Sequence, residues 1–440
     1  MKVFITGGTG FIGRHLVRCM AQTEHTIYCL ARISSDISEL KKLGAHIVIG
    51  DVNDRALLTA GMHGCDWVIH LAGASSWWEP DKTIYRRINV DGTRNVMECA
   101  LENGISKVVH VSNIVIYGKP EKSPIREETP PAQARSGVYA QTKYEGEQIA
   151  WQLYREEGLP LVVVYPCAVM GSGDRKLSGE TIHRLMRRSL PARIFNDRIL
   201  TYVHVKDVAE AILQAARKPD NLGEKYIVGN THLSFDELCD LVGDVSGAAP
   251  PKLRLPDSVV MFAARALTWL ADRMKRPPLW GLSLDAMRML KDGIVADGGK
   301  AERELGITYT SIRQAVDEEV SWYWRWAMEN EEKGSEPWNG RERRVQIRNK
   351  VELSCVVSGL LYGGAIQETG RVTDLTGQGM YVRAAIGLDE GTDVKAQIKA
   401  TRFTEAFWVA GRVLRSSENG MGIRFLDYAP REVDMILNTP

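Results

Sequence analysis

Short apolar runs alternate with longer stretches of helical periodicity along the first part of the chain. Six of these runs have the length and the β-branched composition of buried strands, at residues 3–6, 26–31, 46–49, 67–70, 107–112 and 161–165. Strands that alternate with helices in this way form parallel sheets with helices on both faces. The pattern therefore predicts a doubly wound α/β domain.

The pattern changes twice further along the chain. Between residues 171 and 326 it is mainly helical and interrupted by prolines, which predicts a smaller lobe over the carboxyl edge of the sheet, where doubly wound folds bind ligands. The polar stretch 331–340 has glycines, a proline and no apolar period, and predicts a linker. Beyond it, six segments predict a small antiparallel β-barrel or sandwich with a short terminal helix, the segments being 351–357, 365–372, 380–384, 394–400, 407–414 and 422–425.

The expected organisation is therefore three consecutive parts. Residues 1–330 form the α/β domain with its lobe, 331–340 the linker, and 341–440 the β-domain. One apolar stretch, 259–270, is broken by Arg265 and is too short to span a membrane. Its helical spacing predicts an amphipathic helix, which either packs on the domain or lies on a membrane surface.

Composition excludes several classes of protein. The 440 residues are 44% hydrophobic and 25% charged, with a formal net charge of +1, which indicates a globular chain of more than one domain without a dominant nucleic-acid-binding surface. The seven cysteines contain no CxxC pair, so we expect neither a disulfide framework nor a bound metal. Because the chain enters a strand at once, without an export signal or a transmembrane segment, we expect it in the cytoplasm.

The first strand leads into a glycine-rich turn. Residues 6–13 read Thr-Gly-Gly-Thr-Gly-Phe-Ile-Gly and precede a helical stretch. Gly7 permits the tight turn, Gly10 lets the backbone approach a pyrophosphate, and Gly13 lets the helix pack on the strand. The free N–H groups and the dipole at the start of the helix favour an anion there. The turn predicts a nicotinamide-dinucleotide site.

Residues at the ends of the following strands refine this prediction. The second strand ends at Ala31, where an NAD-preferring site would place a carboxylate, and Arg32 follows it. A guanidinium there can bind a 2′-phosphate through paired charge-assisted bonds, which favours NADP(H) over NAD(H); the alternative is a solvated loop charge. Asp51 and Val52 after the third strand would contact the adenine, and Leu71 and Ala72 close the fourth strand beside the cofactor.

A tyrosine and a lysine lie one helical turn apart, at Tyr139 and Lys143. A phenol titrates near ~10, too high for efficient proton transfer at neutral pH, and a neighbouring ammonium would lower its pKa. The pair predicts that Tyr139 acts as a general acid or base. The alternative is an ordinary pair on a helix surface.

Residues 1–326 resemble the extended short-chain dehydrogenase/reductases, which include nucleotide-sugar epimerases and dihydroflavonol reductase-like enzymes. Beside the glycine turn and the Tyr139–Lys143 pair, the resemblance rests on residues 50–52, 70–73, 89–93, 111–113, 117–118, 202–208 and 300–306. It implies a Rossmann fold with a small substrate lobe, Tyr139 as proton donor or acceptor, Lys143 on the nicotinamide ribose, and often a homodimer. The candidate cofactor-binding residues are Gly7, Gly10, Phe11, Ile12, Gly13, Arg32, Asp51, Val52, Leu71, Ala72, Lys143 and Pro166.

One departure from this family concerns the chemistry. The family's substrate-binding serine or threonine falls on Asn113, whose amide can donate to a carbonyl but cannot relay a proton, unless Ser112 rotates into the role. We therefore expect slower or altered chemistry. The candidate catalytic residues are Tyr139, Lys143, Ser112 and Asn113.

A second departure concerns the substrate pocket. Tyr165 and Pro166 stand where the family commonly has Arg-Pro, and this change is expected to affect the pocket rather than hydride transfer. Trp77 and Trp78 follow the fourth strand, and they either line the pocket or form an exposed loop.

The β-domain carries a basic run and a polar turn. Arg343, Arg344 and Arg348 precede its first strand, and residues 374–379 lie in a turn between two later strands. Either feature alone is typical of a solvated charge run or a plain turn. In combination they resemble a PilZ domain, the bacterial receptor for cyclic di-GMP, whose arginines would grip phosphates and stack on guanine. The candidate cyclic di-GMP-binding residues are Arg343, Arg344, Arg348, Asp374, Thr376 and Gly379.

The leading hypothesis is a bacterial NADP(H)-dependent oxidoreductase or nucleotide-sugar epimerase-like enzyme that cyclic di-GMP regulates. The alternative, motivated by Asn113, is a non-catalytic NAD(P)-binding scaffold that responds to the same effector. The substrate is a small molecule that no motif of the lobe identifies.

Overall fold

In the computed structural model, the described residues are 1–119, 121–332 and six strand segments between 349 and 425. The chain divides into two compact units, Met1–Glu319 and Val320–Pro440. Among the described residues, no helix is long and apolar enough to cross a bilayer.

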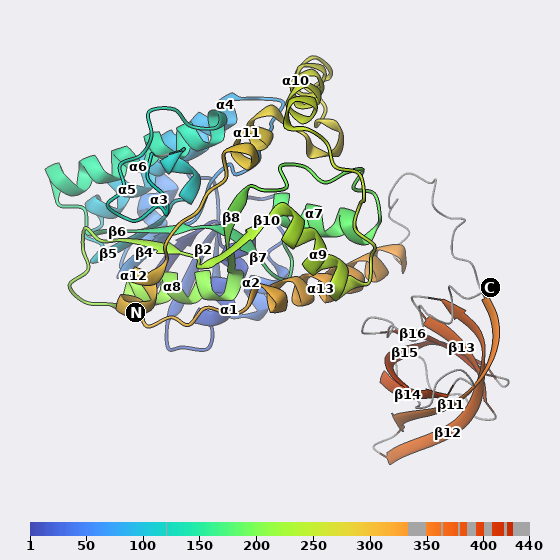
Figure 1. Ribbon diagram of the computed structural model, residues 1–440. Coiled ribbons are helices and arrows are strands. Elements are labelled where there is room, and N and C mark those ends of the chain that lie inside the picture. The colour runs from blue at the N-terminus through green and yellow to red at the C-terminus, as the bar shows by residue number, and fades with distance from the viewer. Residues whose placement is uncertain are drawn as a thin grey trace. The chain divides into compact units, whose positions relative to one another are not determined.

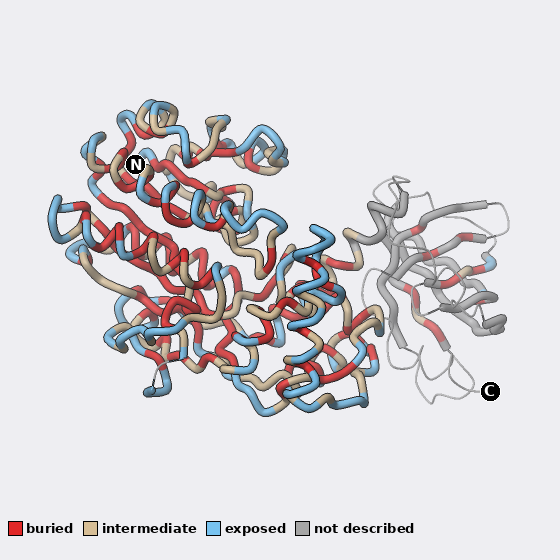
Figure 2. The backbone as a smooth tube through the Cα atoms, turned by 90° about the horizontal axis from the view of Figure 1, so that it is seen from above, coloured by how far each residue is buried: buried red, intermediate tan, exposed pale blue. Residues whose placement is uncertain are grey.

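A seven-stranded parallel sheet forms the centre of the N-terminal unit (Figure 1). Its strands are apolar and largely buried, and they appear as the red interior of Figure 2. The strand order β3-β2-β1-β4-β5-β6-β9 confirms the predicted Rossmann-like sheet. The strands are β1 (Lys2–Thr6), β2 (Thr26–Ala31), β3 (His46–Ile49), β4 (Trp67–His70), β5 (Lys107–Val111), β6 (Leu161–Pro166) and β9 (Lys225–Val228).

Helices cover both faces of this sheet (Figure 1). The segment α1 (Phe11–Met20) lies with α8 (Val205–Arg217) on one face, while α3 (Arg55–Met62), α5 (Thr93–Glu102) and α6 (Gly137–Glu157) lie on the other. The remaining short elements of this part are α2 (Ser38–Lys42), α4 (Thr83–Arg86), the π-helix η1 (Arg87–Gly92) and the 3₁₀ helix η2 (Ile114–Tyr117).

The seventh strand was not predicted from the sequence. β9 lies within the stretch 171–326 that was interpreted as the lobe, and it pairs in parallel with β6. Its four residues, Lys-Tyr-Ile-Val, follow a polar turn and are too few to show a clear period. The chain therefore leaves the sheet after β6, returns to it through α8 and β9, and then leaves again.

The lobe consists of a three-stranded sheet and several helices. The sheet has the order β10-β8-β7, and beside it a cluster of buried apolar side chains forms around Phe195, Val260 and Met287. The strands are β7 (Ala168–Met170), β8 (Ile199–His204) and β10 (Thr231–Ser234). The helices are α7 (Leu177–Met186), α9 (Phe235–Ser246), α10 (Asp257–Met274), η3 (Leu279–Gly281) and α11 (Leu284–Asp292). After them, α12 (Gly299–Leu305) packs against β9 of the central sheet and against α8, and α13 (Ile312–Glu332) follows in the chain.

The described strands of the second unit pair in an antiparallel ring, β11-β12-β13-β16-β15-β14. Each of the six predicted segments overlaps one of them. The helix α13 includes the first two residues of the predicted linker; the rest of that linker and the predicted terminal helix lie outside the described residues. The strands are β11 (Asn349–Leu361), β12 (Gly364–Thr376), β13 (Gly379–Ala384), β14 (Asp393–Lys399), β15 (Phe407–Ser417) and β16 (Gly420–Phe425).

Candidate functional site

The glycine turn joins β1 to α1 so tightly that two of its positions leave no room for a side chain. Gly7 has a φ of +75°, and a Cβ on it would lie 2.6 Å from the backbone nitrogen of Ala72. A Cβ on Gly13 would lie 2.2 Å from the carbonyl oxygen of Gly7. Both contacts are with backbone, which cannot move aside without shifting the strand or the helix. These two glycines are therefore required by the geometry of the turn.

The start of α1 is prepared for an anion. Its N-cap is Gly10, which supplies no capping side chain, and the first helical turn contains no acidic residue. Phe11 and Ile12 are half-buried in that turn. The first N–H groups of the helix therefore lack a side-chain cap, and together with the helix dipole they suit the pyrophosphate of a dinucleotide.

Positive charge lies beside the end of β2. Arg32 is exposed, and no carboxylate forms an ion pair with it within residues 1–119 and 121–332. Arg14, on the first turns of α1, lies 3.8 Å from Asp36 and 3.9 Å from Glu39. Arg14 was not predicted from the sequence, because its position relative to the loop after β2 follows only from the packing of α1.

The other candidate cofactor residues lie at the carboxyl ends of the strands. Asp51 accepts hydrogen bonds from both the backbone and the side chain of Asn53, at 3.0 and 2.6 Å, so its carboxylate orders the turn after β3. Val52 is buried against Gly92. After β4, the Leu71 N–H donates to the Thr6 carbonyl, and the Ala72 N–H to the Thr6 hydroxyl. Pro166 is the last residue of β6.

Two polar residues that received no role in the sequence analysis hold this edge of the sheet together. His70 bonds Thr6 through Nδ1 at 2.7 Å and Thr93 through Nε2 at 3.0 Å, and burial with the nearby Lys143 charge lowers its pKa to about 3. Asn89 accepts from the Ala74 N–H at 2.8 Å and donates to Thr142 at 3.1 Å. They join β1, the loop after β4 and α6. Both residues lie in segments that carry the family resemblance, 70–73 and 89–93, so the sequence could have pointed to them.

The helix α6 carries Tyr139 and Lys143 with both side chains buried. The Lys143 ammonium donates to the Val111 carbonyl at 3.1 Å, and burial lowers its pKa to about 8. Burial also raises the pKa of Tyr139, with the nearby Tyr85 adding to the effect. The expectation of a lowered phenol pKa is thus wrong for the protein alone, because burial disfavours the charged phenolate.

Behind Lys143, one turn further along α6, Glu147 is fully enclosed. It accepts hydrogen bonds from the Ser112 hydroxyl at 2.5 Å, the Trp151 indole at 3.1 Å and the Tyr165 hydroxyl at 2.7 Å. Ser112 is therefore already engaged as a donor. Tyr165 is 0% exposed, so the expectation that this departure affects the substrate pocket is wrong, and its role is to satisfy the buried carboxylate.

Asn113 has one side of its amide fixed. Its Oδ1 accepts a hydrogen bond from the Val115 N–H at 3.0 Å and caps η2. This bond assigns the oxygen to the protein interior and leaves the NH₂ group to act as a donor. Asn113 is only partly buried, so a substrate oxygen can approach that donor.

Trp77 and Trp78 have different surroundings, and neither side chain is exposed. The Trp77 ring lies edge-on to Tyr139, with centroids 5.4 Å apart, and packs against the apolar cluster of the lobe. Trp78 is largely buried and donates to Asp272 on α10 at 2.8 Å. Trp77 therefore forms a wall beside the candidate acid, and Trp78 attaches the loop to α10.

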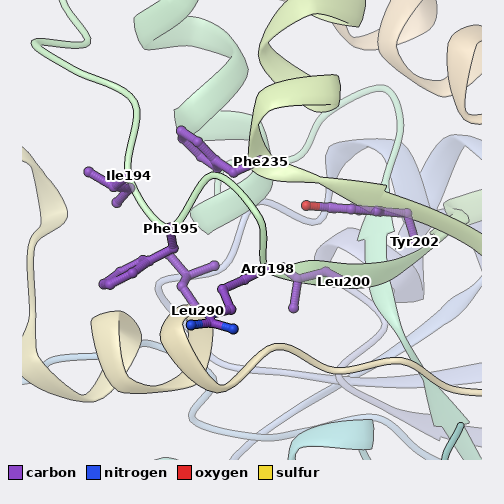
Figure 3. A pocket seen from close by; sticks show the side chains of 7 residues that line it. All are labelled: Ile194, Phe195, Arg198, Leu200, Tyr202, Phe235 and Leu290. Carbon is purple, nitrogen blue, oxygen red and sulfur yellow. The ribbon is translucent and has the colours of Figure 1, made fainter. Parts of the chain in front are cut away.

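The lobe contains a small hollow next to this cluster (Figure 3). Its lining is mostly apolar, with the Arg198 guanidinium the one formally charged group. It has room for about one water molecule, so a substrate needs the lobe to open further there. The lining residues are Ile194, Phe195, Arg198, Leu200, Tyr202, Phe235 and Leu290.

A buried acid anchors α13 to the loop after β7. Glu319 accepts from the Gly173 N–H at 2.8 Å and the Asp174 N–H at 3.2 Å, and it lies 2.5 Å from His183. Burial raises the pKa of Glu319 from its ordinary 4.5 to about 8 and lowers that of His183 to about 4. At neutral pH the two therefore share one proton as a neutral hydrogen-bonded pair. The same loop accepts a bond from His15 on α1 at Ser172.

This anchor predicts a pH-dependent stability. An acid with a raised folded pKa stabilises the fold below its unfolded pKa and loses that contribution as the pH rises through the folded pKa. Between pH 7 and 8, where His183 is neutral in the folded state and mostly neutral in the unfolded chain, we expect the free energy of unfolding of the N-terminal unit to fall by about 1 kcal/mol. Glu319→Gln, which mimics the protonated acid, should remove this slope, and a change at the exposed neighbour, Asp317→Asn, should keep it. Urea unfolding at both pH values measures it, and an unchanged slope in Glu319→Gln would contradict the assignment.

The candidate effector residues are described only in part. Arg343, Arg344 and Arg348 lie outside the described residues. Asp374 and Thr376 lie at the end of β12, and Gly379 begins β13. The strands pair here, with Thr376 opposite Gly379 and Asp374 opposite Tyr381, so these residues lie in strands and not in the predicted turn. Residues 377 and 378 lie outside the described residues.

Comparison with known proteins agrees with this architecture. The model of the NAD dependent epimerase/dehydratase family matches residues 3–229, and the PilZ domain model matches residues 342–438. A putative dihydroflavonol 4-reductase from Synechocystis is 31% identical, with 73% of this chain and 94% of the relative aligned. Sterol demethylase protein B from Methylococcus capsulatus is 28% identical over 73% of this chain and 98% of its own length.

Solved structures show the same fold for the N-terminal part. The crystal structure of gox2253 has a TM-score of 0.64 and 30% identity, and covers 74% of this chain and 98% of its own. A UDP-glucose 4-epimerase from Thermotoga maritima has a TM-score of 0.61 at 21% identity, which shows the fold alone. With its glycine turn, seven-stranded sheet and Tyr139–Lys143 helix, the chain belongs to the NAD dependent epimerase/dehydratase family of extended short-chain dehydrogenase/reductases, and it carries a PilZ domain after this enzyme unit.

Proposed function

We propose that the enzyme unit is an NADP(H)-dependent oxidoreductase that interconverts a ketone and a secondary alcohol on a largely apolar substrate. The observation that carries this proposal is the wall beside Tyr139. Trp77 meets the phenol edge-on and backs onto a cluster of Phe195, Val260 and Met287. An apolar substrate would bury its surface against such a wall, whereas a sugar would leave its hydroxyl groups without partners there.

The roles of the polar groups follow from their surroundings. NADPH supplies the hydride when it is bound. Tyr139 gives its phenolic proton to the carbonyl oxygen, beside the wall that Trp77 forms. Asn113 donates from its NH₂ group to the same oxygen and so stabilises the charge that develops on it. Lys143 would hold the cofactor's ribose. Glu147 positions α6 by accepting the hydrogen bonds of the three buried donors described above.

Arg32 supports the choice of NADP(H). It lies after β2, exposed and without an ion-pair partner in the described part of the enzyme unit, so its guanidinium is available to a 2′-phosphate. The names of two relatives support an apolar substrate, since one is called a putative dihydroflavonol 4-reductase and the other a sterol demethylase protein. We further propose a homodimeric enzyme of the cytoplasm.

The second part of the proposal is regulation by cyclic di-GMP. The PilZ match supports it, as do the arginines at 343, 344 and 348 and the turn at 374–379. We place the domains at residues 1–330 and 341–440, with the linker between them. Regulation requires that the effector bind two arrangements of the barrel and linker with different affinity.

A substrate panel tests the proposed reaction. Purified full-length protein is mixed with NADPH or NADP⁺ and with ketosteroids, dihydroflavonols, long-chain ketones, their alcohols, or UDP-sugars, and the nicotinamide absorbance is followed. We expect turnover on an apolar ketone or alcohol. Epimerised UDP-sugars, detected by chromatography, with no turnover on any apolar compound would contradict the proposal.

The same assay with saturating cyclic di-GMP tests the regulation. We expect a change of about fivefold or more in turnover or in NADPH affinity. Arg344→Ala and Arg348→Ala should weaken effector binding in calorimetry and remove this change. Unchanged turnover, cofactor affinity and oligomeric state at saturation would refute the regulatory part while leaving the reaction intact.

A further inference from the structure

The helix α10 presents an apolar face to solvent at the edge of the lobe, away from the sheet (Figure 1). Phe262 is 76% exposed and Trp269 is 67% exposed. They share a face with the exposed residues Val259, Leu270 and Met274, as the helical spacing requires. Aromatic side chains of this size are rarely left in water without a partner.

The opposite face of α10 already has its partners. Val260 and Ala264 are buried in the apolar cluster of the lobe. The exposed face is therefore a second apolar surface, on a helix that is already held in place by its buried face. It needs an occupant from outside the cluster.

The surroundings of this face are strongly basic. From Lys252 to Trp280 the sequence holds six lysine and arginine residues and two aspartates, although the whole chain has a net charge of only +1. Both aspartates pair with cations from other segments: Asp272 lies 3.3 Å from Lys82, and Asp257 lies 3.9 Å from Arg198. Of the six cations, Arg254 pairs with Asp236 at 2.7 Å. Within the described residues, Arg265, Arg273 and Arg276 have no ion-pair partner.

We propose that this face, defined by Val259, Phe262, Trp269, Leu270 and Met274 with the flanking arginines, docks on the surface of an anionic lipid bilayer. An apolar stripe with large aromatic residues and basic flanks is the composition of helices that lie in the headgroup region. Long arginine side chains reach from such a stripe to lipid phosphates. The occupant is a membrane surface that α10 lies on and does not cross.

A second copy of the chain fits the same face poorly. A twofold interface would place the patch against itself, and the excess of arginines and lysines would then meet its own kind. An anionic surface removes this repulsion and uses the same charges for attraction. Charge therefore favours the bilayer.

Vesicle flotation with the full-length protein tests the proposal. We expect binding to vesicles of phosphatidylcholine with phosphatidylglycerol, and much weaker binding to phosphatidylcholine alone or at high salt. The paired changes Phe262→Ala with Trp269→Ala, and Arg265→Glu with Arg273→Glu, should each lower the partition coefficient by about tenfold or more. The controls Leu222→Ala and Arg155→Glu, at exposed positions away from α10, should stay within about twofold, because an apolar side chain or a cation is changed there without touching the patch.

Unchanged NADPH affinity shows that each variant is folded. No binding to any vesicle, or binding that neither paired variant weakens, would overturn the proposal. A dimer in sedimentation equilibrium that Phe262→Ala with Trp269→Ala dissociates, with no vesicle binding, would assign the face to a second copy. The measurement needs no substrate, so its outcome is independent of the proposed reaction.

Discussion

Replacing Tyr139 with phenylalanine is expected to lower kcat by about 10²–10⁴-fold, the usual contribution of a positioned general acid. The change removes one hydroxyl and keeps the ring that lies edge-on to Trp77. Within the described residues that hydroxyl makes no hydrogen bond, so its loss should leave the fold and the cofactor site intact. The measurement is turnover of the best substrate of the panel, together with NADPH affinity.

The matched control for this prediction is Tyr144→Phe. Tyr144 follows Lys143 on the same helix, and the Arg135 guanidinium stacks on its ring, a contact that phenylalanine keeps. Its turnover should stay close to that of the unaltered enzyme. If Tyr139→Phe retained most of its activity, the proton would have to come from another group, and the assignment of Tyr139 would fail.

Arg32→Ala is expected to weaken NADPH binding by about ten- to a hundredfold, which corresponds to the loss of charge-assisted bonds to a phosphate. NADH has no 2′-phosphate, so its affinity should change little. The preference between the two cofactors should therefore fall by the same factor. Titration of both cofactors, followed by calorimetry or fluorescence, gives the ratio.

Two further variants sharpen the test of Arg32. Lys41→Ala removes an exposed cation from the nearby helix α2 and should leave both affinities unchanged. Arg14→Ala should have a smaller effect than Arg32→Ala, because Asp36 and Glu39 already offset the Arg14 charge. Equal losses for NADPH and NADH in Arg32→Ala would show that the residue supports the loop and does not select the cofactor.

The sheet was largely predictable from the sequence because most of its strands are buried, the edge strand β3 being the exception. Segments such as β4, with the sequence Trp-Val-Ile-His, stand out as short apolar runs between helices. β9 did not stand out, since it has four residues and follows a polar turn inside a helical region. The paths of the strands after β6 depend on packing that no local pattern records.

The candidate site was predictable where it depends on spacing and unpredictable where it depends on distant contacts. The glycine turn and the Tyr139–Lys143 pair are local motifs. The structure has the positive φ that the turn requires at Gly7, and it places the pair on the helix α6. The bond between Ser112 and Glu147 joins residues 35 positions apart, so its claim on the Ser112 hydroxyl could not be foreseen. The raised pKa of Tyr139 likewise follows from burial, which spacing does not report.

The return of the chain to the sheet through α8 and β9 has a consequence for how specificity can evolve or be transplanted. The lobe is built from two separate stretches, one between β6 and α8 and one after β9. β8, from the first stretch, pairs with β10, from the second. A lobe from a relative therefore cannot be grafted at one pair of junctions. Recombination that exchanged only one stretch would join unmatched strands, so the two stretches are expected to be inherited together.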